Sequence, residues 1–179
     1  MNPTLAPWSD YYMITGAAAA SLTGLMFVVI TLVAGQERIV KNMRDGVETF
    51  SSPVVVHFGA ALLMSATMAV PWGSLGPAAA TLALISVFGM VYATRVALRM
   101  SQQNRYEPEF DDWFWYAVVP LAAYVVVFAA AIALWSSSEQ ALYALAAGTM
   151  TLIFAGIRNA WDIVTYIAVE MKSKDPESD

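Results

Sequence analysis

Apolar residues fill most of the chain in five long blocks, which short polar segments separate. The blocks cover residues of about 11–34, 53–70, 77–98, 113–135 and 139–169. A bilayer core about 30 Å thick needs roughly 20 apolar residues of helix, and the blocks lack the alternation of membrane strands. The pattern predicts an all-α integral membrane bundle of five transmembrane helices. It forms one domain over residues 1–170, with a short polar tail at 171–179.

Several blocks begin with residues that favour the start of a helix. The cap-and-proline pattern in "FSSPV" predicts that a helix begins at Pro53, and "SLGP" predicts the same near Pro77. Asp111 and Asp112 precede the fourth block, where carboxylates stabilise the positive end of a helix dipole. Inside that block, Pro120 is expected to kink the helix and to free a backbone carbonyl.

Composition supports a membrane protein, since 59% of the 179 residues are hydrophobic and only 13% are charged. A soluble domain has about 25% charged residues. The net charge of −5 arises from acidic residues in one loop and at the C-terminus, and no basic face for nucleic acid is present. The chain has no cysteine, which excludes disulfides, thiolate metal sites and cysteine nucleophiles.

Basic residues follow the connections in an alternating pattern. They occur after the first and third blocks, at the inner end of the fifth block and in the tail, whereas the turns "PWGSLGP" and "SSSEQ" have none. The positive-inside rule makes the basic side cytoplasmic. We therefore expect the N-terminus outside and the C-terminus in the cytoplasm, which agrees with an odd number of spans.

Small residues recur every four positions in the first block, at Gly16, Ala20 and Gly24. This spacing lets two helix backbones approach closely in a membrane. The partner helix could belong to the same chain or to a neighbouring subunit, and the sequence leaves both alternatives open.

A stripe of small and polar residues follows one face of the fifth block at steps of three and four residues. Its members are Gly148, Thr151, Ala155, Arg158, Asp162 and Thr165, and Asn159 adjoins it. Such a stripe faces protein or water rather than lipid. Arg158 and Asp162 are four residues apart and are expected to pair along the helix. The stripe indicates either a boundary arginine paired in the headgroup zone or a polar site at a cytoplasmic pore mouth.

Two further ionisable residues are expected at the depth of Arg158. His57 would lie one turn inside the second span, and Arg95 one turn inside the end of the third. His57 could respond to pH near neutrality, or it could simply hydrogen-bond a neighbouring helix. The acidic loop before the fourth block could attract cations or merely cap the helix; it holds Glu107, Glu109, Asp111 and Asp112.

The sequence contains no phosphate loop, no paired metal-binding histidines and no nucleophile elbow. We therefore expect no enzyme activity, no metal site and no cofactor. The strings "GLMFVVITLVAG", "FSSPVVVHF", "AVPW" and "GIRNAWDIVTYIA" resemble those of a group of small, multi-spanning bacterial inner-membrane proteins without an assigned function. That resemblance implies a bacterial inner-membrane location.

Three functions are compatible with these patterns. The sequence favours a homo-oligomeric ion channel or passive pathway that the fifth helix, with the second, would line. Arg158 and Asp162 would set the charge at its cytoplasmic mouth, and His57 would tune it with pH. An accessory or assembly subunit, bound to other membrane subunits, is the second hypothesis. The third is a lipid-binding protein that uses Arg95 and Arg158 on headgroup phosphate. The bilayer itself is a partner in all three.

Overall fold

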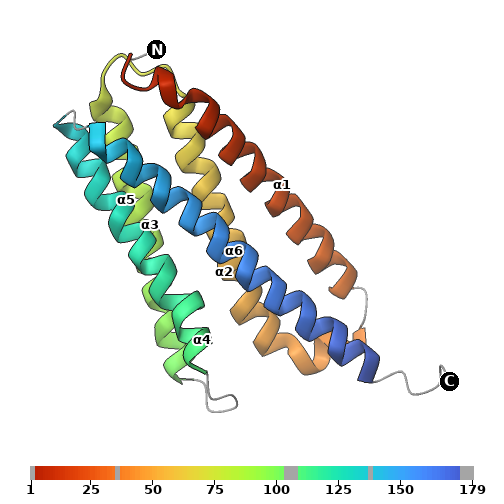
Figure 1. Ribbon diagram of the computed structural model, residues 1–179. Coiled ribbons are helices and arrows are strands. Elements are labelled where there is room, and N and C mark those ends of the chain that lie inside the picture. Colours follow the sequence, from red (N-terminus) through yellow and green to blue (C-terminus); the bar gives the residue numbers. More distant parts are fainter. Residues whose placement is uncertain (1–2, 35–36, 103–108, 137–138, 174–179) are drawn as a thin grey trace.

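The structure is a computed structural model that describes residues 3–34, 37–102, 109–136 and 139–173, with side chains described for 3–32, 53–102, 109–136 and 139–165. All its regular elements within these ranges are helices (Figure 1). The long ones are α1 (Ser9–Ala34), α2 (Glu37–Ala69), α3 (Leu75–Gln102), α5 (Val119–Trp135) and α6 (Glu139–Ser173). The short ones are η1 (Ala6–Trp8), α4 (Phe110–Trp113) and the π-helical η2 (Phe114–Val118), and α4 and η2 lead directly into α5.

Four helical segments are long and apolar enough to cross a membrane, namely Ala6–Leu32, Leu75–Gln102, Phe110–Trp135 and Glu139–Thr165. In α2 the described apolar stretch, Pro53–Ala69, is shorter. Trp113 and Trp135 mark the two ends of the third segment. They are 22 residues apart, or about 33 Å along a helix, which matches the hydrocarbon thickness of about 30 Å. The expected all-helical bundle is therefore present, with four described segments long and apolar enough to span a membrane where five spans were expected.

The start of α2 differs from the expectation. The helix begins at Glu37, and Pro53 lies inside it rather than at its first position. The segment of residues 37–49, expected as a loop, is helical. A proline is compatible with the interior of a membrane helix when neighbouring groups satisfy the freed backbone, so "FSSPV" is not a start signal here. Helix α3 begins at Leu75, close to the expected position.

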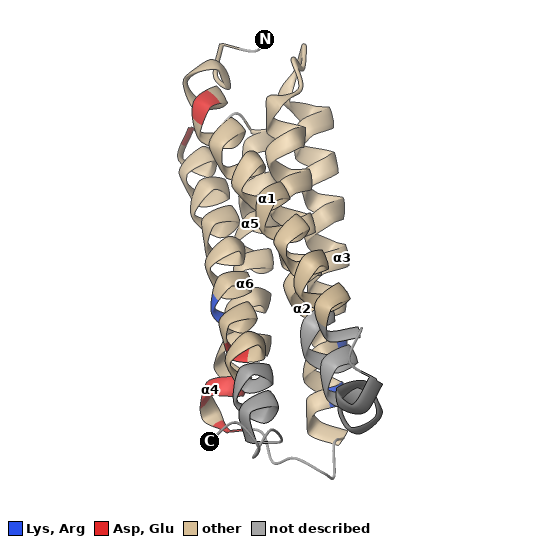
Figure 2. Cartoon of the chain, turned by 90° about the vertical axis from the view of Figure 1, so that its right-hand side faces the viewer, with Lys and Arg blue, Asp and Glu red and all other residues tan. Residues whose placement is uncertain are grey.

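The long helices run alternately up and down the bundle. Helix α1 packs mainly on α2, α3 packs on α5, and α6 lies between α2 and α5. We call the end where α1 begins the proximal end, and the end where α6 finishes the distal end (Figure 1). Among residues with described side chains, the basic ones are Arg95 and Arg99 near the end of α3 and Arg158 in the second half of α6. Figure 2 shows the described Lys and Arg positions in blue in the distal half.

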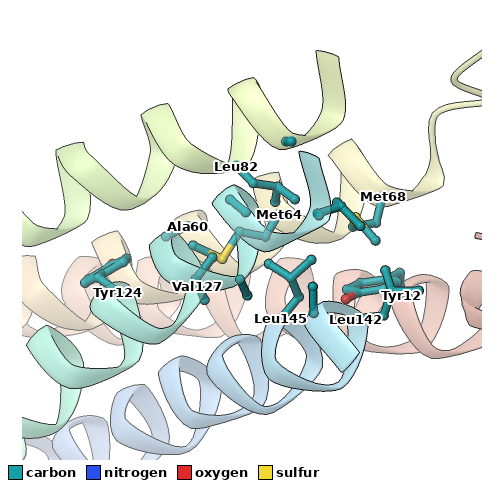
Figure 3. Close-up of a cluster of buried hydrophobic side chains, with 14 of the residues drawn as sticks. Tyr12, Ala60, Met64, Met68, Leu82, Tyr124, Val127, Leu142 and Leu145 are labelled. Atoms are coloured by element: carbon teal, nitrogen blue, oxygen red, sulfur yellow. The ribbon is translucent and has the colours of Figure 1, made fainter. Parts of the chain in front are cut away.

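The main core lies between α2, α3, α5 and α6. Figure 3 shows Met64, Val127 and Leu145 gathered there, and each is at most 1% exposed. Glycine permits the closest approaches around this core. A Cβ at Gly89 would overlap the ring of Tyr124, and a Cβ at Gly148 would overlap Val127. Close packing of the bundle thus depends on glycines, which leave room for neighbouring side chains, as well as on large buried side chains.

The entry into α5 contains a local π-helical turn. The Val119 N–H donates to the Phe114 carbonyl, five residues back. The next residue is Pro120, which has no N–H to donate. Within the helix, the Trp115 carbonyl could accept from the N–H of Val119, four residues on, or of residue 120, five residues on. Neither donates to it, because Val119 donates to Phe114 and Pro120 has no N–H. In an α-helical register Pro120 would remove the donor of the Tyr116 carbonyl, four residues back. In the π-helical register it is the Trp115 carbonyl, five residues back, that loses this donor and needs one from another helix.

Candidate functional site

The ion pair expected on α6 is present, since Arg158 contacts Asp162 one turn further along the helix. Their side chains are 34% and 37% exposed. The pair therefore lies at the edge of the bundle and not in its interior. An exposed pair at this spacing contributes only about 0.3–0.5 kcal/mol to helix stability.

The stripe on α6 is not a continuous polar surface. Gly148 and Ala155 are buried, whereas Thr151 and Thr165 are half-buried. The Thr151 hydroxyl donates to the Ala147 carbonyl, and the Thr165 hydroxyl donates to carbonyls of Trp161 and Asp162. These hydroxyl hydrogens are therefore used within α6, and only the oxygen lone pairs of the two threonines are open to another group.

Asn159 provides the missing donor for the π-helical turn. Its side chain is 0% exposed, and its Nδ2 donates to the Trp115 carbonyl over 3.2 Å. In return, the Tyr116 hydroxyl donates to the Asn159 backbone carbonyl, also over 3.2 Å. The two bonds join α6 to η2 at the distal end. The sequence offered two signals for this contact, an asparagine within the fifth apolar block and Pro120 within the fourth. The number of residues between them does not show that they meet.

His57 bonds to α5 and not to η2, which Asn159 reaches. Its neighbour Phe58 packs against Gly156, two residues before Arg158 on α6, and the expectation of a common depth with Arg158 stays a prediction. Its Nδ1 is 3.0 Å from the Tyr124 hydroxyl, and the histidine is 1% exposed. Tyr124 lies eleven residues from both Trp113 and Trp135, about 16 Å from either end of the span. His57 does not lie one turn inside its helix as expected, because α2 begins at Glu37.

The surroundings of His57 are aromatic and closely packed. The Tyr92 ring lies edge-on at 6.5 Å between centroids, and the Tyr124 ring rests on Gly89. Within the described part of the chain, the Nε2 atom of His57 has no hydrogen-bond partner. The contact of His57 Nδ1 with the Tyr124 hydroxyl of α5 confirms the expected hydrogen bond to a neighbouring helix.

Arg95 is exposed on α3. Of the acidic loop, Glu107 lies outside the described residues. Glu109 and Asp112 form a capping box at the start of α4, in which the Glu109 backbone N–H donates to Asp112 Oδ2 over 3.1 Å. The capping interpretation is thus confirmed for these two residues, and Asp111 is exposed beside them. In the described ranges, no three His, Cys, Asp or Glu side chains are grouped to hold a metal.

The small residues of α1 divide between two faces. A Cβ at Gly16 would lie 3.1 Å from the Ser65 Cβ of α2, and next to it the hydroxyls of Thr15 and Ser65 are 3.1 Å apart. Gly16 therefore packs inside the bundle. Ala20 is exposed, and a Cβ at Gly24 would meet nothing within 4 Å. Those two positions are open to the outside.

In comparisons with known proteins, no family model, no curated protein and no solved structure matches this chain.

Proposed function

We propose that this protein is an accessory or assembly subunit of a membrane complex, and that the outward face of α1 binds a transmembrane helix of another chain. The observation that carries the proposal is the composition of that face. Five small residues lie exposed within two turns of α1, namely Ala17, Ala18, Ala20, Ser21 and Gly24. Exposed small residues let a second helix approach closely, whereas contact with lipid alone requires no such surface.

The low burial of α1 supports the same proposal. Only 17% of its most apolar stretch is buried, against 33% in α3, 44% in Phe110–Trp135 and 56% in α6. On α1 the large exposed side chains, such as Met13 and Phe27, lie to either side of the small ones along the helix. Exposed alanines also occur on α5 and α6, as at Ala129 and Ala147. On α1, the Ser21 hydroxyl bonds to the Ala17 carbonyl, so it adds no unsatisfied group to the face.

We place the chain in a bacterial inner membrane, with its distal end in the cytoplasm and its N-terminus outside. The charge distribution supports this orientation. The described basic residues, Arg95, Arg99 and Arg158, lie toward the distal end, whereas Asp10 and Glu139 lie at the proximal end. Basic residues favour the cytoplasmic side.

A homo-oligomeric ion channel, which the sequence favours, has weaker support from the geometry. The buried polar side chains His57 and Asn159 bond to neighbouring helices inside the bundle, and the Thr151 hydroxyl bonds to its own backbone. Arg158 and Asp162 are partly exposed, but most described exposed side chains of α6 are apolar, such as Met150, Phe154 and Ile157. An axis between copies along α6 would be lined mainly by these apolar side chains. The channel is the alternative hypothesis. A complex that contains copies of this chain alone would support it.

Cysteine cross-linking in native membranes tests the docking face, because the natural chain has no cysteine. We expect Ala20→Cys to cross-link to a second membrane protein with a short homobifunctional or photoactivatable thiol reagent. Ala129→Cys, at an exposed alanine of α5, is the matched control and is expected to give mainly lipid adducts. Equal protein cross-linking from both positions would contradict a docking role for α1.

A further inference from the structure

An apolar groove lies between α1 and α6 in the distal half of the bundle. Its volume is about 220 Å³. It is lined by Leu22, Leu25, Met26 and Val29 of α1, by Phe58 of α2, and by Ile157, Ala160, Trp161 and Val164 of α6. All nine side chains are aliphatic, thioether or aromatic. The groove differs from the face with the small residues, because it opens between two helices of the same chain.

The groove exists because α1 touches α6 at few positions and packs mainly on α2. The two helices run side by side in the same direction (Figure 1). At the proximal end they are joined, since the Tyr11 hydroxyl donates to the Ala146 carbonyl over 2.7 Å and the rings of Trp8 and Tyr143 stack edge-on at 4.8 Å. Further along, Phe58 of α2 fills part of the space between them.

Phe58 is held in place by a glycine of α6. A Cβ at Gly156 would overlap its ring, and Phe58 is itself 1% exposed. The groove therefore has a fixed aromatic floor. Packed neighbours hold that floor in one position, so the groove belongs to the folded bundle and does not depend on a rearranged side chain.

The size of the groove selects among possible occupants. One turn of an α-helix, about 10–12 Å wide and 5.4 Å long, occupies roughly 400–600 Å³, which is more than the volume of this groove. Pockets for small metabolites have about 300–1,000 Å³ and present a few placed polar groups. This groove is smaller and has no polar side chain apart from the indole of Trp161. A single hydrocarbon chain meets both the size and the chemistry.

The position of the groove identifies the source of that hydrocarbon. Its α6 residues, Ile157 to Val164, flank the level at which Asn159 bonds to Trp115, near the distal end of the Phe110–Trp135 span. We propose that the groove holds one acyl chain of a phospholipid from the leaflet at the distal end. Arg95 and Arg158 are absent from its lining, so the site selects an acyl chain and not a particular headgroup.

The proposal is independent of the function proposed for the outward face of α1. A groove-filling substitution tests it. The protein is reconstituted with dioleoyl phosphatidylcholine, extracted into detergent, and examined by native mass spectrometry under increasing activation. We expect the natural chain to retain one phospholipid that is lost last, and we expect Ala160→Phe to lose it at low activation. Ala147→Phe, at an exposed alanine of α6 outside the groove, is expected to retain it.

A second measurement uses the natural chain and Trp161. Phosphatidylcholine brominated on one acyl chain is titrated into the protein in detergent. We expect tryptophan quenching with a saturable component at one lipid per chain, and we expect Trp161→Phe to abolish that component. Quenching that rises without saturation, or lipid retention that is equal in Ala160→Phe and the natural chain, would overturn the proposal. So would a protein segment cross-linked into the groove in place of lipid.

Discussion

Replacing Asn159 with leucine is expected to destabilise the bundle by about 1–3 kcal/mol, the cost of leaving a buried polar group unsatisfied. The substitution keeps the size of the side chain similar and removes the Nδ2 donor of the Trp115 carbonyl. That carbonyl has no donor from its own helix, because Val119 donates to Phe114 and Pro120 has no N–H. The measurement is the free energy of unfolding in mixed micelles, followed by circular dichroism and tryptophan fluorescence.

A double-mutant cycle shows whether the loss arises from the carbonyl itself. In the π-helical register of η2, Pro120→Ala restores an N–H that can donate to the Trp115 carbonyl, five residues back. We therefore expect Asn159→Leu to cost at least about 1 kcal/mol less when Pro120→Ala is present. Thr151→Val on the same helix is the control, since its hydroxyl bonds only to the Ala147 carbonyl. An Asn159→Leu cost that is the same in both backgrounds would show that the two positions are not coupled through Trp115.

Replacing Gly89 with alanine is expected to destabilise the bundle by about 1–3 kcal/mol through overpacking. The added Cβ would overlap the Tyr124 ring, which is 0% exposed and surrounded by packed side chains. Moving that ring also disturbs the hydrogen bond between the Tyr124 hydroxyl and His57. The measurement is again the free energy of unfolding, together with the histidine signals in an NMR spectrum selectively labelled at His57.

Gly59→Ala on α2 is the matched control for Gly89→Ala. A Cβ at Gly59 would meet nothing within 4 Å, and alanine has a higher helix propensity than glycine by about 1 kcal/mol. We expect Gly59→Ala to be neutral or stabilising and to leave the histidine signals unchanged. If both alanine variants had the same stability as the natural chain, the close contact between α3 and α5 would not exist.

The sequence predicted the long helices well, because continuous apolar blocks of this length have few alternatives in a bilayer. It also predicted the pair between Arg158 and Asp162, since a spacing of four residues brings side chains together on any helix. It failed at the start of α2. The pattern "FSSPV" is compatible both with a helix start and with a proline in a helix interior, and only the packed bundle selects between them.

The contacts of Asn159 and His57 could not be predicted for a different reason. Both depend on which turn of one helix lies opposite which turn of another, and apolar blocks do not specify that register. Gly89 and Gly156 were missed likewise, because a glycine that accepts a neighbouring ring has no periodicity of its own. The stripe on α6 was expected to face protein or water, and its members Gly148 and Ala155 are buried against protein. That its polar members form a site stays a prediction.

The most direct test of the account is native mass spectrometry on the protein extracted gently from its own membrane. If α1 docks a helix of a different chain, the natural protein will be found in a stoichiometric complex with another membrane protein, and Gly24→Leu will release it from that complex. A chain found alone, or only with copies of itself, would contradict the proposed function. Copies alone would favour the channel hypothesis and make ion flux the next measurement.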